Sequence, residues 1–115
     1  MPHLRIAVEY ARDEERTHAI AEALRTAGSL VTALGLRPDD VFIAFADRAH
    51  TEAHAELFIE GHVPSDGLRP EIATTIAYAF LAAIPAPTRT VHVFVRKAHA
   101  RDGGFAAGEA FVFTK

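Results

Sequence analysis

The chain has 115 residues, of which 50% are apolar and 23% charged, and this composition fits one globular domain over residues 1–115. It contains no cysteine, which excludes disulfides, thiolate metal sites and cysteine nucleophiles. A net charge of −3 with scattered arginines argues against nucleic acid as a partner. No apolar run reaches the roughly 18 residues of a membrane span and no signal peptide pattern is present, so we expect a soluble, cytoplasmic protein without a membrane partner.

The first predicted strand, His3–Tyr10, alternates apolar and polar residues directly after Met1-Pro2. Proline is tolerated as the first residue of a strand because no ladder hydrogen bond is lost there, and this is the structural explanation for Pro2. If Met1 is removed, Pro2 instead presents a secondary amine, held in a ring at the chain terminus. Strand parity puts Pro2 on the side of Leu4, where apolar surroundings lower the pKa of such an amine. Pro2 is therefore a candidate catalytic base, on the condition that Met1 is removed.

Two amphipathic helices and four further strands follow. Residues Asp13–Leu34 carry apolar side chains at intervals of three and four after an acidic start that suits a helix N-terminus. Residues Arg69–Ile84 show a second such row, with Pro70 in the first turn and Pro85 to end it. The remaining strands are predicted at Val41–Asp47, Ala55–Gly61, Thr90–Ala98 and Ala110–Thr114.

The two halves of the chain resemble each other at an offset of about 51 residues: Ile6–Tyr10 matches Leu57–Gly61, and Val41–Phe45 matches Val91–Val95. The pattern indicates two copies of one βαβ unit and a tail, at about residues 1–52, 53–102 and 103–115. Right-handed crossovers in both units place both helices on one face of a four-stranded mixed sheet. We therefore predict a two-layer α+β (α/β) fold with a short C-terminal strand or hairpin.

Apolar residues occupy both faces of the predicted inner strands. Phe42, Phe58 and Phe94 have the parity opposite to that of Val41, Leu57 and Val93. Strands of this kind are normally buried on both sides. Two helices cannot cover both faces, so we expect a homo-oligomer that packs sheet against sheet.

Four features together resemble the tautomerase superfamily, which includes 4-oxalocrotonate tautomerase, 5-carboxymethyl-2-hydroxymuconate isomerase and macrophage migration inhibitory factor. They are Pro2, VEYARDEE at 8–15, DGLRPE at 66–71 and FAAGE at 105–109. The second and third resemble the strand-loop-helix junctions of the family's repeats, and the last resembles its aromatic and glycine hairpin. The opening Met-Pro-His-Leu and the ending Phe-Val-Phe-Thr-Lys are most similar to the 5-carboxymethyl-2-hydroxymuconate isomerase branch.

The resemblance implies a homotrimer without cofactor or metal, in which the terminal proline acts as general base and acid. The implied reaction is keto–enol or double-bond isomerisation of a small carboxylated 2-oxo or 2-hydroxy acid, as in aromatic catabolism. One base can serve both proton transfers when its pKa lies near the working pH.

Arginines are the candidates for binding the substrate carboxylate, because a guanidinium can hold it in two parallel hydrogen bonds. Arg12 follows the first strand near the position of the family's loop arginine, although the closest match puts Ala11 there. Arg69 lies about two positions beyond the family's glycine-arginine pair, and Arg37 precedes the second strand. We rank them in the order Arg12, Arg37, Arg69, with a solvated surface side chain as the alternative for each.

Tyr10 and His92 complete the predicted substrate contacts. Tyr10 could donate a hydrogen bond to a substrate oxygen or be a half-buried strand tyrosine. His92 occupies the family's second arginine position, in the strand before the hairpin. The segment His50–His54 has two histidines at helical metal-ligand spacing, but it lacks the adjacent glutamate of zinc proteases, which favours a polar connection over a metal site.

A non-catalytic function stays open as the alternative. The βαββαβ order is shared with ferredoxin-like small-ligand-binding modules, and an oligomeric scaffold could keep the fold without the family arginines. Pro2, the matching halves and the C-terminal strand favour the tautomerase.

Overall fold

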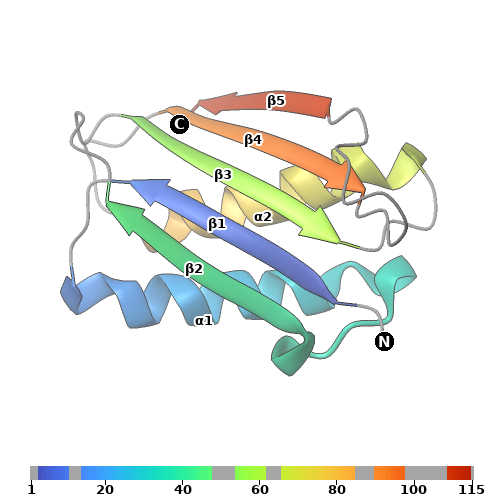
Figure 1. The fold of residues 1–115 in the computed structure, drawn as a ribbon, viewed down its shortest axis with the longest axis horizontal. Helices are drawn as coiled ribbons and strands as arrows, with labels where there is room; N and C mark the ends of the chain where they lie inside the picture. The colour runs from blue at the N-terminus through green and yellow to red at the C-terminus, as the bar shows by residue number, and fades with distance from the viewer. Residues whose placement is uncertain are drawn as a thin grey trace.

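Five strands form one mixed sheet, and two α-helices cover one of its faces (Figure 1). The computed structural model describes residues 3–10, 14–47, 54–61, 66–84, 90–97 and 109–114. The elements are β1 Leu4–Tyr10, α1 Glu14–Leu30, β2 Val41–Asp47, β3 His54–Gly61, α2 Arg69–Ala83, β4 Thr90–Lys97 and β5 Glu109–Thr114, with 3-10 turns η1 Thr32–Leu34, η2 Pro38–Asp40 and η3 Asp66–Leu68. The described elements confirm the predicted α+β fold.

The sheet order is β2-β1-β3-β4-β5. Strand β1 is parallel to β2, and β3 is parallel to β4, so each half of the chain contributes one parallel pair. The halves join through the antiparallel pair of β1 and β3. Strand β5 pairs antiparallel with β4 of its own chain and makes the fifth strand of the sheet.

The core lies between the sheet and the helices. Leu4, Ile6 and Val8 of β1 are at most 1% exposed, because alternate side chains of a strand point to the same face. Both helices turn their apolar rows onto this face, and β3 and β4 add theirs. The largest fully buried side chains from these elements include Ile20, Leu24, Leu57, Ile59, Ile72, Ile76 and Phe80.

Helix α1 ends four residues earlier than its apolar spacing predicts. The chain leaves the helix after Leu30, and Val31 adopts a ψ of 88°. The 3-10 turn η1 then keeps Leu34 in the core, and Gly35, with a φ of +63°, reverses the chain toward Pro38 and β2. The apolar positions were therefore predicted correctly, but the last of them lies in a turn.

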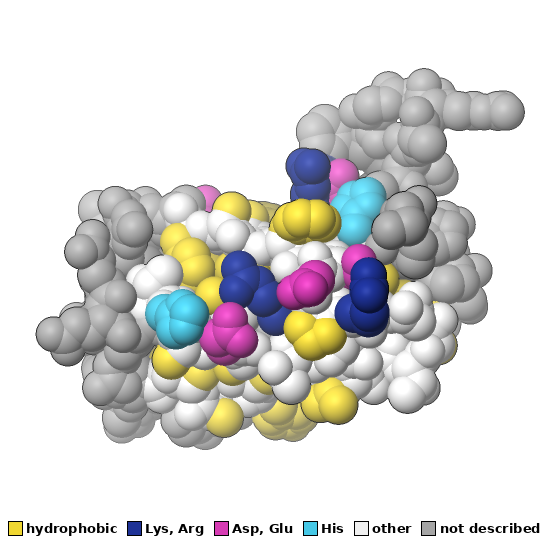
Figure 2. All heavy atoms as spheres, turned by 90° about the horizontal axis from the view of Figure 1, so that it is seen from below, with side chains coloured by type: hydrophobic (Ala, Val, Ile, Leu, Met, Phe, Trp, Pro, Cys, Tyr) yellow, Lys and Arg dark blue, Asp and Glu magenta, His cyan; other side chains and the backbone are white. Residues whose placement is uncertain are grey.

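Neither α-helix is long and apolar enough to cross a bilayer, among the residues that the structure describes. Viewed from the edge formed by β2 and α1, basic, acidic and histidine side chains are interspersed on the surface (Figure 2). A strongly basic patch of the kind that binds nucleic acid is not visible in the coloured part of this view.

Candidate functional site

The face of the sheet opposite the helices, here the open face, carries its side chains in rows that cross the strands. Strand register places Phe42, Arg5, Glu60 and Arg96 side by side from β2 to β4, and we call them the arginine row. The next row is the phenylalanine row, composed of Ala44, Ala7, Phe58, Phe94 and Ala110. The third is the glutamate row, composed of Glu9, Glu56, His92 and Val112.

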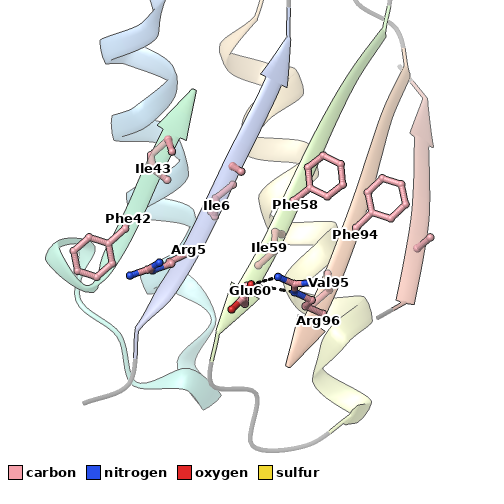
Figure 3. Close-up of a pocket in the computed structure, with 13 residues that line it drawn as sticks. Arg5, Ile6, Phe42, Ile43, Phe58, Ile59, Glu60, Phe94, Val95 and Arg96 are labelled. Atoms are coloured by element: carbon pink, nitrogen blue, oxygen red, sulfur yellow. Dashed lines mark hydrogen bonds and ion pairs between the residues drawn. The ribbon is translucent and has the colours of Figure 1, made fainter. Parts of the chain in front are cut away.

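In the arginine row, Glu60 accepts a hydrogen bond of 3.0 Å from Nε of Arg96 and a second from its Nη2. Figure 3 shows this pair on the neighbouring strands β3 and β4, with Arg5 beside Phe42 on the other side of Glu60. Arg5 is exposed. Charge-assisted pairs orient the side chains that form them, so the guanidinium of Arg96 is held in place by Glu60. Arg5, the other cation of this row, is accessible to solvent.

The phenylalanine row is the apolar centre of the open face. The rings of Phe58 and Phe94 stack with centroids 4.9 Å apart and planes 9° from parallel. Phe42 is 54% exposed and Phe58 39%, which confirms that large apolar side chains point away from the helices. An open hollow of about 970 Å³ lies over the phenylalanine and arginine rows, between β2 and β5 (Figure 3).

The chain start and two of the predicted arginines belong to the same end of the sheet. Leu4, the first residue of β1, pairs with Val41 of β2 and with Gly61 of β3. Arg37 precedes Val41 by four residues, and Arg69 follows Gly61 by eight. Pro2 lies outside the described residues, two positions before Leu4.

Arg37 is an accessible cation. Its side chain is 78% exposed, and its Nε lies 3.9 Å from a carboxylate oxygen of Asp40. The same carboxylate accepts a hydrogen bond of 3.0 Å from the backbone N–H of Arg37, as in a capping box at the start of η2. Because an exposed ion pair of this length contributes little energy, Asp40 does not prevent Arg37 from binding an anion.

Arg69 is more enclosed. It is the first residue of α2, directly before Pro70, and its side chain is half-buried, with Nε shielded from solvent. A partly buried guanidinium is less strongly solvated than one on the surface, so an anion that reaches it is held in a medium of lower dielectric constant.

Tyr10 and His92 lie at the opposite end of the sheet. Tyr10 ends β1, and its side chain lies outside the described residues, as does Arg12. His92 is the third residue of β4, half-buried in the glutamate row. Because six residue steps of β1 span about 20 Å, one protomer does not bring the two ends together in a single site.

The open face also contains charged residues that the sequence did not single out. Arg5, Glu60 and Arg96 have the same strand parity as Phe58 and Phe94. That shared parity was the available signal, because it puts the three charges on the face that the helices leave open. Their side-by-side arrangement depends on the register between β1, β3 and β4, which the sequence alone did not predict.

Two other predicted features lie partly or wholly outside the described residues. They are the histidine pair of His50–His54, of which only the backbone of His54 is described, and the hairpin at 105–109, of which only Glu109 is described. Among the residues described, no group of three or more histidine, aspartate or glutamate side chains is arranged to hold a metal ion.

Comparison with protein families and with curated proteins gives no match for this chain. Solved structures do share its fold. A fused 4-OT wild-type asymmetric trimer has a TM-score of 0.63 at 16% identity, over 82% of this chain and 85% of that one. MIF2 of Leishmania major has a TM-score of 0.56 at 21% identity, over 92% of this chain and 97% of that one.

A third neighbour is FG41 malonate semialdehyde decarboxylase inhibited by 3-bromopropiolate, with a TM-score of 0.55 at 17% identity, over 92% of both chains. These neighbours are members of the tautomerase superfamily. The chain therefore has a tautomerase/MIF-like fold, as its sequence predicted. The identities are too low to carry an activity from any of these proteins to this one.

Proposed function

We propose that the protein is a cofactor-independent tautomerase in which Pro2, after removal of Met1, is the catalytic base and acid. The observation that carries this proposal is the combination of a tautomerase/MIF-like fold with a proline two residues before the start of β1. The proposed reaction is keto–enol or double-bond isomerisation of a small carboxylated 2-oxo or 2-hydroxy acid. The chain termini favour the 5-carboxymethyl-2-hydroxymuconate isomerase branch, and with it a cytoplasmic role in aromatic catabolism.

The proposed chemistry needs one base and one anion site. The amine of Pro2 takes a proton from the carbon beside the substrate carbonyl, and the resulting dienolate receives the proton back at another carbon or at oxygen. A single group serves both transfers when its pKa lies near the working pH. Leu4, Ile6 and Val8, all buried, anchor β1, the strand that follows Pro2 in the sequence.

Arg37 and Arg69 are the proposed carboxylate contacts within the same protomer. Arg37 precedes β2 and Arg69 follows β3, and these ends of β2 and β3 pair with the start of β1. A guanidinium at this position would bind the substrate and favour the negative charge that develops on the dienolate. Tyr10 and His92 belong to the other end of the sheet, and Arg12 follows Tyr10 by two residues in the sequence. In this proposal these three residues act from another copy of the chain in a homotrimer.

Replacement of Pro2 by alanine tests the base. We expect Pro2→Ala to reduce kcat for ketonisation of 2-hydroxymuconate or phenylenolpyruvate by at least 100-fold, in the range that one general base contributes. Pro70→Ala is the matched control, because it replaces an exposed proline at the first turn of α2. Intact mass must first show that Met1 is absent. Wild-type turnover by Pro2→Ala, or a mass that retains Met1, would leave the non-catalytic scaffold as the better reading.

A further inference from the structure

We propose that His3 is a positioning residue for Pro2, and that it acts through a ring contact with Phe42 of the neighbouring strand β2. This inference rests on the proposed function, because it concerns how the start of the chain is held in place for the catalytic base. The backbone nitrogen of His3 is bonded to the carbonyl carbon of Pro2, and His3 lies one position before β1. Both strands that flank β1 lie close to this residue.

On the side of β2, the contact is between two rings. The ring centroids of His3 and Phe42 are 6.1 Å apart and their planes are 72° from parallel, which is the edge-to-face arrangement that aromatic rings favour. Strand register explains this contact, because Arg5 pairs with Phe42 and His3 lies two positions before Arg5 on the same face of the sheet. The contact holds the His3 side chain at the end of the sheet, where it is half-buried.

On the side of β3, the backbone of His3 lies close to Gly61. A Cβ on Gly61 would be 2.6 Å from the carbonyl oxygen of His3, so β3 can approach the chain here only because Gly61 has no side chain. The next residue, Leu4, pairs with Gly61 in the sheet. The side chain of His3 is thus held by β2 while its carbonyl group lies against β3, and the residue is located from both sides.

Few rotations separate the backbone of His3 from the amine of Pro2. The peptide bond between the two residues is planar, and the nitrogen of Pro2 is closed into a ring with its own Cα. Only ψ of Pro2 and φ of His3 then determine where the amine lies relative to the rest of His3. A general base must be within hydrogen-bond reach of the proton that it takes, and a shift of about 1 Å can lower the rate about 100-fold. Loss of the ring contact should therefore slow the proposed reaction.

NMR relaxation of the backbone amide of residue 3 tests this anchor without any reference to activity. We expect its order parameter to fall from about 0.85 to below about 0.6 in His3→Ala and in Phe42→Ala, because either substitution removes the ring contact. Phe58→Ala is the matched control, since it removes a ring from the same face but in the phenylalanine row, and it should leave residue 3 as ordered as in the wild type. Circular dichroism shows whether each variant is folded. An unchanged order parameter in the folded His3→Ala and Phe42→Ala proteins would overturn the proposal.

Turnover of phenylenolpyruvate tests the effect on the base. We expect His3→Ala and Phe42→Ala each to lower kcat about tenfold and to leave KM within about twofold, because the orientation of the base matters in the transition state and not in substrate binding. His3→Phe keeps a ring at this position and should bring kcat to within about threefold of the wild type. A His3→Phe protein as slow as His3→Ala would overturn the ring contact as the cause, because it lacks only the imidazole nitrogens.

The double variant His3→Ala with Phe42→Ala shows whether the two residues act through one contact. If they do, the second substitution adds little, and kcat falls about tenfold in total, whereas independent effects would multiply to about 100-fold and overturn the proposal. Pro2→Ala separates this inference from the proposed function. Wild-type turnover by Pro2→Ala would remove both. An inactive Pro2→Ala beside a fully active His3→Ala would keep the proposed function and overturn only the role of His3.

Discussion

At Gly61 the absence of a side chain lets the start of the chain lie close to β3. A Cβ on Gly61 would be 2.6 Å from the carbonyl oxygen of His3 and 2.9 Å from Cδ1 of Leu4. A backbone oxygen cannot rotate away as a flexible side chain can, so β1 itself would have to shift. Gly61 thus contributes to the position of the residues that follow Pro2.

We therefore expect Gly61→Ala to lower the free energy of unfolding by about 1–3 kcal/mol, as overpacking does in well-packed regions. Urea denaturation measures this change. Gly35→Asn is the control: space around Gly35 is open, its φ is +63°, and asparagine tolerates this region better than other residues. A Gly61→Ala protein as stable as the wild type would show that β1 can move away from β3 at this end.

At this scale, the sequence can predict the position of a single residue, while the binding role of each arginine stays a prediction. Arg37 and Arg69 were selected by their positions before a strand and at a helix start, and both lie at the end of the sheet where the chain begins. The arginine row was missed because its members are charged residues from three separate strands. Only register, which is a tertiary property, makes them neighbours.

At the scale of the element, β5 is an edge strand held by one neighbouring strand and by α2. Its residues pair with Thr90–Val95 of β4, and the ring of Phe113 meets Tyr78 of α2 edge-on at 5.9 Å between centroids. Tyr78 is 59% exposed, so the main contact of its ring is with β5. The ring contact fixes β5 against the helix layer, at the edge of the sheet where strands are least protected.

Removal of this ring should loosen β5 selectively. We expect Tyr78→Ala to weaken the local protection of β5 by about 1 kcal/mol, or roughly fivefold faster hydrogen exchange of its amides, with the amides of β1 unchanged. Tyr78→Phe keeps the ring and should exchange like the wild type. Equal acceleration in β1 and β5 would mean that the ring supports the whole fold and not this strand.

The elements themselves were predicted almost completely, because each carries a local signal. Periodicity located both helices, and alternation located the five strands within one residue at each end. The predicted end of α1 was wrong because Leu34 continues the helical spacing of apolar residues, although it lies in η1, where it is buried in the core. The position of β5 was not fixed by the sequence either, since a C-terminal strand can pair with its own sheet or with a neighbour's.

At the scale of the whole molecule, the predicted homo-oligomer has a thermodynamic signature that does not depend on activity. Folding that is coupled to association becomes more favourable as protein concentration rises, because the folded copies bind one another and the unfolded chains do not. For a domain of this size, a tenfold increase in concentration should raise Tm by about 3–6 °C. A protein that folds as an independent monomer would melt at the same temperature throughout.

The phenylalanine row should control this dependence. Phe58→Ser combined with Phe94→Ser removes the stacked rings from the open face but leaves the core beneath the helices intact, since both rings lie on the other side of the sheet. We expect this variant to fold, to melt at a temperature independent of concentration and to sediment as a monomer. Leu30→Ser, which changes an equally apolar residue that is 65% exposed on α1, should keep the wild-type dependence. Loss of the concentration dependence in both variants would contradict a specific role of the open face, because Leu30→Ser does not alter that face.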